Sequence, residues 1–235
     1  MKSVLILGGS SDIGLSVIEI FLRKNWKVVA QFNSKKINLK KYNYSIENLT
    51  CIKCNFDDSK AVKKLLKKIK SHNISSCINL IGYIDNVSYE HFNLENLIQS
   101  LKINTIMPLH LIKNLLPIMI KNKFGRILNI SSIGVKFGGG KKTFNYSFSK
   151  NALEFIPSYF NELAKKNILI NNLRVGVTKT KIHNKIQNKN LNKRVSLIPM
   201  KRMANTREIA KFIYQLASDE NTYITRQTLS ISGGE

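Results

Sequence analysis

Three groups of residues in this chain have the types and spacing that carbonyl chemistry needs. The first is Tyr146-Ser-Phe-Ser-Lys150, in which a tyrosine and a lysine lie four residues apart. On a helix this spacing puts both side chains on one face, where the ammonium favours the phenolate and lowers the pKa of the phenol. A hydroxyl from Ser132, in Asn129-Ile-Ser-Ser132, can then hold a carbonyl oxygen beside that phenol. These residues predict a site where a proton passes between the tyrosine and a substrate oxygen.

A glycine-rich turn near the N-terminus completes the set. Gly8-Gly-Ser-Ser-Asp-Ile-Gly14 follows the apolar run Val4–Leu7 and precedes an amphipathic segment, which is the context of a phosphate-binding turn. Glycine lets the backbone approach a pyrophosphate, and the start of a helix supplies unpaired N–H groups. Together with the serine, tyrosine and lysine, the turn predicts a nicotinamide-dependent oxidoreductase in which the cofactor carries the hydride.

Short apolar runs alternate with helical periods along the chain, which predicts βαβ units around a parallel sheet. The expected strands are Val4–Leu7, Lys27–Phe32, Leu49–Cys54, Cys77–Leu80, Arg126–Ile130, Leu169–Leu173 and Thr228–Ile231. The expected helices are Ile13–Lys24, Ser59–Ser71, Leu94–Lys121, Tyr146–Lys166 and Arg207–Ala217. We expect an α/β fold, a doubly wound Rossmann-type parallel sheet of about seven strands in a three-layer α/β/α arrangement.

The whole chain, residues 1–235, is expected to form one domain. Residues 178–203 have no strand pattern and many Lys and Asn residues. We expect this segment to be a lid that contacts the substrate.

The chain is strongly basic, with 38 Lys and Arg residues against 14 acidic residues and a net charge of +24. Such a field can attract nucleic acid, an anionic membrane or an acidic carrier protein. The lysines are scattered through nearly every helix among many Asn and Ile residues, as an AT-rich genome would place them, so most are expected to be solvated surface. We expect no nucleic-acid partner, because no aromatic and basic residues interleave in a strip. No membrane association is expected either, because no apolar run reaches about 18 residues.

Three cysteines give no disulfide framework. Cys51-Ile-Lys-Cys54 has C-x-x-C spacing, but residues three apart on a strand point to opposite faces. No second Cys or His pair accompanies it, and we expect no metal. The chain starts on a strand pattern rather than a signal peptide, so a cytoplasmic location is expected.

The ordered motifs resemble those of the short-chain dehydrogenase/reductase family, from Leu5 to Gly234. The stretches that carry the resemblance are Leu7–Gly14, Asn79–Gly82, Asn104, Ser132, Tyr146–Lys150, Val175–Gly176 and Ile231–Gly234. Two positions depart from the family pattern near the glycine turn, where Leu7 replaces Thr and Asp12 replaces the middle Gly. The Asp12 carboxylate is expected to cap the helix that follows.

The resemblance implies four catalytic residues: Asn104, Ser132, Tyr146 and Lys150. Tyr146 is expected to be the general acid toward a ketone, or the base toward an alcohol. Ser132 would donate to the substrate oxygen, and Lys150 would favour the phenolate and hold the nicotinamide ribose. Asn104 would position a water that links Lys150 to solvent.

The cofactor choice is visible in Gln31-Phe-Asn-Ser-Lys-Lys36, which follows the second strand and holds no carboxylate. A carboxylate there would bind the ribose hydroxyls of NAD, so its absence predicts NADP, with NAD second. The expected cofactor-binding residues are Gly8, Ser10, Ser11, Asp12, Ile13, Gly14, Asn33, Ser34, Lys35, Asn55, Phe56, Asn79, Gly82, Tyr146, Lys150 and Thr178.

A dense set of cations in and around the lid predicts an anionic substrate, either a small molecule or a carrier-linked group. The set is Arg174, Lys179, Lys181, His183, Lys185, Lys189, Lys193, Arg194, Lys201 and Arg202. The motif layout most resembles the 3-oxoacyl-acyl-carrier-protein reductase branch. A reductase or dehydrogenase for a nucleotide-linked or acidic sugar in surface polysaccharide biosynthesis is the alternative, because Asp12 and Val175 depart from the acyl-reductase pattern. A non-catalytic binding protein on the same scaffold is the third hypothesis.

The resemblance also implies a homodimer or homotetramer, formed through the helices Leu94–Lys121 and Tyr146–Lys166. The second holds Leu153–Phe160, which is more apolar than one buried stripe requires. Surplus apolar surface on a sheet-covering helix can pack against a twofold mate.

Overall fold

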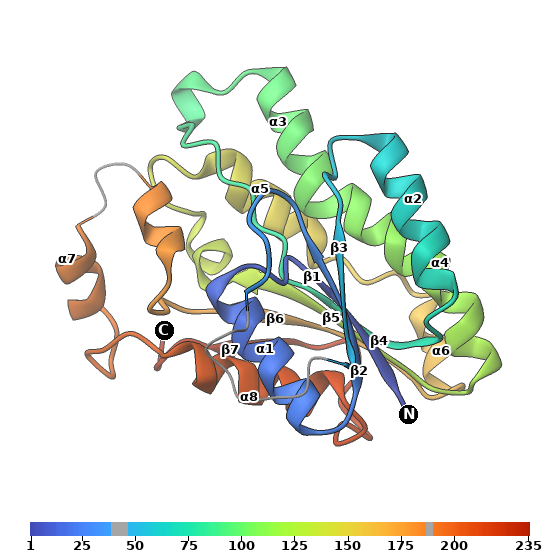
Figure 1. Ribbon diagram of the computed structural model, residues 1–235. Helices are drawn as coiled ribbons and strands as arrows, with labels where there is room; N and C mark the ends of the chain where they lie inside the picture. The colour runs from blue at the N-terminus through green and yellow to red at the C-terminus, as the bar shows by residue number, and fades with distance from the viewer. Residues whose placement is uncertain (39–46, 187–189) are drawn as a thin grey trace.

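Seven parallel strands form a single sheet with helices on both faces (Figure 1). The computed structural model describes residues 1–38, 47–186 and 190–235. The strands are β1 Ser3–Leu7, β2 Lys27–Phe32, β3 Leu49–Lys53, β4 Ile74–Asn79, β5 Gly125–Ser132, β6 Ile168–Val175 and β7 Thr228–Ile231. Their order is β3-β2-β1-β4-β5-β6-β7, which confirms the doubly wound fold. The order reverses between β1 and β4, and ligands bind at such a switch point.

The described residues also form helices, most of which cover one face of the sheet or the other. They are α1 Asp12–Arg23, α2 Ser59–Lys70, α3 Leu94–Leu101, α4 Met107–Lys121, α5 Phe144–Leu153, α6 Phe160–Ala164, α7 Leu191–Ser196 and α8 Thr206–Ala217. Short turns of helix lie at η1 Tyr89–His91, η2 Lys102–Ile106, η3 Ile133–Phe137 and η4 Lys181–Lys185. Phe21 of α1 and Ile213 of α8 are buried in one core. Leu65 of α2, Leu111 of α4 and Leu163 of α6 are buried in the other.

The helices α3 and α4 join through the π-helical turn η2 into one continuous helix, Leu94–Lys121. Pro108 lies in the first turn of α4 and Pro117 inside it, so the helix continues through both. By length and composition this 28-residue helix could cross a membrane. Here its second half covers the sheet, with Leu115 and Met119 buried in the core.

The expected single helix Tyr146–Lys166 is wrong. The helix α5 ends at Leu153, and α6 begins only at Phe160. Pro157 stands in the gap, and a proline lacks the N–H that a helix interior needs. The break leaves Phe155 at 73% and Tyr159 at 56% exposure, so part of the surplus apolar stretch faces outward.

The segment predicted to be a lid, residues 178–203, contains η4 and α7 and no strand within its described part. Its two ends meet where Thr178 forms a β-bridge with Ala204. The C-x-x-C pair lies on and just after β3, with Cys51 exposed and Cys54 buried, which confirms that the two thiols point apart. Among the described residues no group of three His, Cys, Asp or Glu is placed to hold a metal.

Candidate active site

The glycine turn between β1 and α1 has the shape of a phosphate cradle. Gly8 adopts φ +76°, and a Cβ on Gly14 would lie 2.7 Å from the carbonyl oxygens of both Gly8 and Gly9, so only glycine fits there. Gln31 of β2 supports the turn, because its side-chain oxygen accepts from the Gly8 N–H at 2.9 Å. The first N–H groups of α1 have no partner within the helix and are the natural donors for a pyrophosphate.

Asp12 does not cap the helix, contrary to our expectation. Ser11 is the N-cap, and its hydroxyl accepts from the Gly14 N–H at 3.0 Å. The Asp12 carboxylate instead accepts from the Lys181 N–H of the lid at 2.7 Å. This residue therefore ties the lid to the first turn of the phosphate cradle.

The loop after β2 presents the residues predicted to select the cofactor. Asn33, Ser34 and Lys35 are all exposed. A Cβ on Gly9 would lie 3.2 Å from Ile37, so this loop folds back beside the glycine turn. The position suits a phosphate on the adenosine ribose.

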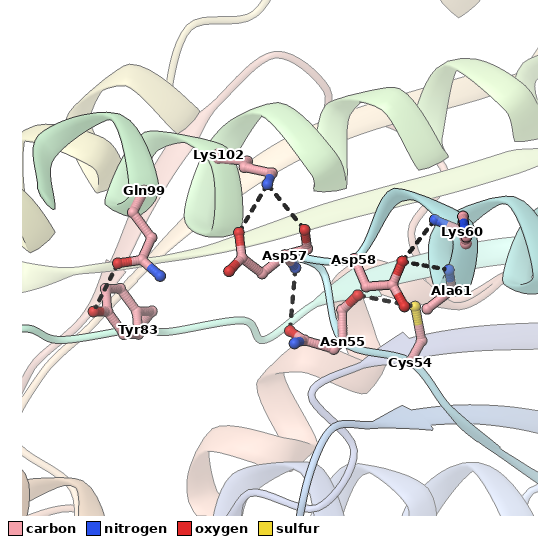
Figure 2. A network of polar contacts seen from close by, with 9 residues as sticks. All are labelled: Cys54, Asn55, Asp57, Asp58, Lys60, Ala61, Tyr83, Gln99 and Lys102. Atoms are coloured by element: carbon pink, nitrogen blue, oxygen red, sulfur yellow. Dashed lines mark hydrogen bonds and ion pairs between the residues drawn. The ribbon is translucent and has the colours of Figure 1, made fainter. Parts of the chain in front are cut away.

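The turn after β3 holds Asn55, predicted to lie on the adenine side (Figure 2). Its side-chain oxygen accepts from the Asp57 N–H at 3.1 Å. Asp57 forms an ion pair with Lys102 at 2.8 Å, and this lysine holds the pKa of the carboxyl below its usual value. The Phe56 side chain is buried in the core, so only its backbone is available to a ligand.

The end of β4 brings two more predicted residues to the same edge of the sheet. Asn79 is fully buried, and its side-chain oxygen accepts from the Ile81 N–H at 3.2 Å. A Cβ on Gly82 would lie 3.8 Å from the ring of Tyr146. The loop after β4 therefore connects the predicted cofactor site with the predicted proton donor.

Tyr146 and Ser132 meet across the ends of α5 and β5. The protein around Tyr146 desolvates its phenol and raises the pKa to about 12, while a hydrogen bond with Ser132 acts in the opposite direction. The Ser132 hydroxyl also accepts from the Gly134 N–H at 3.2 Å, which orients it at the strand end. The structure brings the predicted proton donor and the predicted oxyanion donor together.

Lys150 lies behind this pair, with 2% of its surface exposed. Its amine donates to the carbonyl oxygens of Ile81 at 2.5 Å and Ile130 at 2.6 Å. An ammonium has three N–H donors, so one is left for a ligand or the phenol. Burial lowers the pKa of Lys150 to about 7, and the nearby Glu154 carboxylate opposes that shift.

Asn104 is buried in the π-helical turn, and its hydrogen bonds hold the loop after β4. Its side-chain oxygen accepts from the Tyr83 N–H at 2.7 Å, and its amide donates to the Tyr83 carbonyl at 3.0 Å and to Ser149 at 2.9 Å. Tyr83 also reaches α3, because its hydroxyl donates to Gln99 at 3.3 Å (Figure 2). These contacts give Asn104 a role in holding the loop, and the water-positioning role stays a prediction.

Three of the cations predicted to attract an anionic substrate form ion pairs within the protein. Arg174 binds Glu154 at 2.6 Å and Arg202 binds Glu208 at 2.7 Å, while Arg194 pairs with Glu235. Lys179 and Lys181 at the start of the lid are exposed. Thr178 is buried, and its hydroxyl donates to the Gly176 carbonyl at 3.0 Å. The predictions for Lys189 lie outside the described residues.

Glu154 was missed in the sequence, where it looked like an ordinary polar residue on a longer helix. Its only sequence signal is the spacing of four from Lys150, which puts a carboxylate one helical turn beyond the lysine. In the structure its side chain is 9% exposed and accepts from Ser131 at 2.6 Å.

A phosphate-binding turn at the switch point of a parallel sheet, with a serine, tyrosine and lysine at the same edge, defines a dinucleotide-dependent oxidoreductase. Residues 8–235 match the family model described as enoyl-(acyl carrier protein) reductase. The chain therefore belongs to the short-chain dehydrogenase/reductase family and is an oxidoreductase of that family.

Relatives of known function cover the whole chain. The 3-oxoacyl-acyl-carrier-protein reductase of Buchnera aphidicola subsp. Acyrthosiphon pisum is 29% identical over 237 residues, which are 99% of this chain and 96% of that protein. The structure of ElxO with NADP bound has a TM-score of 0.81 and 27% identity and covers 99% of this chain and 97% of its own. A 4-hydroxyisoleucine dehydrogenase complexed with NADH has a TM-score of 0.86 and 25% identity, with 100% and 98% covered.

Proposed function

We propose that this protein reduces a ketone to a secondary alcohol with NADPH, and that Tyr146 supplies the proton. The observation that carries the proposal is the meeting of Tyr146, Ser132 and Lys150 beside Gly82, at the edge where the glycine turn opens. A nicotinamide held across this edge would deliver the hydride. The residues of this chain then have to hold the ketone oxygen and provide a proton.

Each residue has a physical role in that step. Ser132 donates a hydrogen bond to the substrate oxygen, where negative charge grows during the reaction. Tyr146 gives its proton to the same oxygen. The phenolate that forms is stabilised by the Lys150 ammonium, because its two carbonyl partners hold the amine in place.

NADPH is the cofactor that the residues fit best. The cradle at Gly8 and Gly14 has room only for glycine, which suits a pyrophosphate. The exposed Asn33, Ser34 and Lys35 offer amide, hydroxyl and ammonium donors without a carboxylate. The NADP in ElxO supports this choice. Since a similar dehydrogenase holds NADH, a titration of both cofactors is the direct test, and tighter NADH binding would overturn the choice.

The substrate we propose is a 3-oxoacyl thioester, in a carrier-linked or smaller form. Support comes from the Buchnera reductase, which matches over the full chain. The comparisons do not favour the sugar reductase. A cytoplasmic location and a homodimer or homotetramer remain parts of this proposal.

The test is NADPH consumption with acetoacetyl-coenzyme A, a 3-oxoacyl thioester, beside crotonyl-coenzyme A, the corresponding enoyl thioester. We expect turnover with the ketone, because the Tyr146 and Ser132 hydroxyls lie within hydrogen-bonding distance of each other and can share one substrate oxygen. Turnover with the enoyl thioester alone would replace ketone reduction by carbon–carbon double-bond reduction. No turnover with either, together with tight NADPH binding, would refute the thioester substrate.

A further inference from the structure

A partly buried ion pair, Glu154 with Arg174, has no part in the mechanism above. Glu154 follows Lys150 by one helical turn, at the end of α5. Its carboxylate accepts from Arg174 Nε at 2.9 Å, from Arg174 Nη2 at 2.6 Å and from the Ser131 hydroxyl at 2.6 Å. Both carboxylate oxygens are bound, and bidentate arginine–carboxylate pairs are among the stronger and more directional polar contacts.

The pair joins the end of α5 to β5 and β6. Ser131 immediately precedes Ser132 on β5, and Arg174 lies near the end of β6. The Glu154 carbonyl accepts from the Asn172 side chain of β6 at 2.7 Å. The helix α5 ends at Leu153, directly before Glu154. These contacts stabilise the end of the helix, where no further helical turn follows.

The Glu154 carboxylate of this pair also acts electrostatically on Lys150. Tyr146 and Glu154 lie four residues before and after Lys150, on the same face of the helical turn. Arg174 of β6 binds the Glu154 carboxylate. The strand β5 and the loop after β4 present carbonyl oxygens. Burial disfavours the ammonium and the Glu154 carboxylate favours it, while the Arg174 guanidinium offsets part of that carboxylate's charge.

We propose that Glu154 and Arg174 are positioning residues that hold Lys150 in its ammonium form and set the pH range over which it stays so. The proposal rests on the proposed function for its main readout, because the ammonium stabilises the phenolate of Tyr146. It gives each partner a distinct effect: Glu154 favours the charged lysine, and Arg174 weakens that influence.

The two partners should therefore have opposite effects when they are removed. In Glu154→Gln the lysine loses its carboxylate and faces an uncompensated guanidinium, so it gives up its proton at lower pH. In Arg174→Gln the full charge of Glu154 acts on the lysine, which keeps its proton to higher pH. We expect the alkaline limb of kcat/KM for ketone reduction to move by about one pH unit in each case, in opposite directions.

The experiment measures kcat/KM from pH 6 to 10 with acetoacetyl-coenzyme A and NADPH. Arg174→Lys restores the positive charge and should return the limb to its wild-type position. Glu154→Gln/Arg174→Gln should place it between the two single variants. Glu208→Gln breaks an exposed pair of the same kind with Arg202 and should leave the limb unmoved. Equal losses of rate with an unmoved limb in both single variants would show a purely structural ion pair and overturn the proposal.

A second readout needs no substrate and separates this proposal from the proposed function. A lysine with a folded-state pKa near 7 stays charged in the unfolded chain up to about pH 10. Unfolding then takes up a proton between these values, so stability rises with pH across that window. The difference in Tm between wild type and Lys150→Met should begin to rise near pH 7.

In the Glu154→Gln background that rise should begin at lower pH, and in the Arg174→Gln background at higher pH, each measured against its own Lys150→Met partner. If no ketone is reduced but these shifts appear, the proposed substrate fails and the charge pair stands. Coincident curves in all three backgrounds would overturn the charge pair, whatever the substrate.

Discussion

At the scale of single residues, burial disfavours the charged forms of the side chains that the proposed mechanism uses. Surrounding protein raises the pKa of the Tyr146 phenol to about 12 and lowers that of the Lys150 amine to about 7. Both shifts favour the neutral forms, since desolvation penalises charge. Reduction needs a neutral phenol that can become a phenolate, so the compensating groups matter most. Ser132 at the phenol and Glu154 at the amine supply that compensation.

Replacement of Tyr146 by Phe tests the proton donor. The ring and its packing against Gly82 stay, but the hydroxyl is gone, and general acid catalysis contributes about 100- to 10,000-fold. We expect kcat to fall within that range while NADPH binding and Tm stay close to wild type. Tyr223→Phe, at a residue with 94% exposure, is the matched control and should be unaffected. Wild-type turnover by the Tyr146 variant would remove this residue from the mechanism.

At the scale of elements, the predicted lid is held by backbone contacts at its base, after β7 and at the start of α1. Thr178 pairs with Ala204 at its base, and Met200 donates its N–H to the Gly233 carbonyl at 3.1 Å. The contact between Asp12 and the Lys181 N–H joins it to the phosphate cradle. A pyrophosphate bound at the glycine turn would lie close to this contact, so we expect cofactor binding to affect the position of this segment.

Asp12→Asn should loosen the start of the lid. An amide oxygen is a weaker acceptor than a carboxylate, because charge-assisted hydrogen bonds are roughly twice as strong. We expect faster hydrogen exchange at the Lys181 amide, and faster NADPH association and dissociation, with little change in Tm. Asp58→Asn, at the N-cap of α2, is the control for loss of an acidic residue at a helix start. An unchanged exchange rate at Lys181 would show that the contact does not hold the lid.

The sequence was enough to predict the sheet, because strands buried on both faces read as short apolar runs between helical periods. It was also enough to predict that Ser132, Tyr146 and Lys150 share one edge. The break in the helix at Pro157 and the pairing of Arg174 with Glu154 were not predicted. The break has a local cause, a proline that the sequence shows, whereas the ion pair joins residues 20 apart, which periodicity does not report. Asp12 shows the same limit, since its partner is 169 residues away.

At the scale of the whole molecule, apolar side chains lie exposed along α3, η2 and α5. Ile98 and Ile106 are each 52% exposed, and Phe148 is 47% exposed. Exposed apolar surface of this kind marks interaction sites, and the two helices are those implied in oligomerisation. The proposed homodimer or homotetramer would cover it.

Ile98→Asp/Ile106→Asp tests this assembly. A carboxylate in an apolar interface must be desolvated without a partner, so the assembly should dissociate to monomers in light scattering at micromolar concentration. Leu197→Asp on the lid side, at 66% exposure, is the control and should leave the mass unchanged. A wild-type protein that is already monomeric would refute the proposed oligomer.

Some of the cations behind the net charge of +24 are expected to attract the substrate, and the others to be solvated surface. Arg174, Arg194 and Arg202 are engaged in ion pairs, so the exposed Lys179 and Lys181 are the residues left at the start of the lid. Lys179→Gln/Lys181→Gln should raise KM for an anionic thioester several-fold and leave kcat near wild type, since such a pattern reports lost uniform binding. The effect should shrink as salt rises, because exposed charges are screened over about 8 Å at physiological ionic strength.

The control is Lys67→Gln/Lys68→Gln on α2, on the opposite side of the molecule from α7 (Figure 1), which removes the same charge elsewhere. An equal rise in KM for both double variants would assign the effect to the overall field, and no rise in either would leave these lysines as solvated surface.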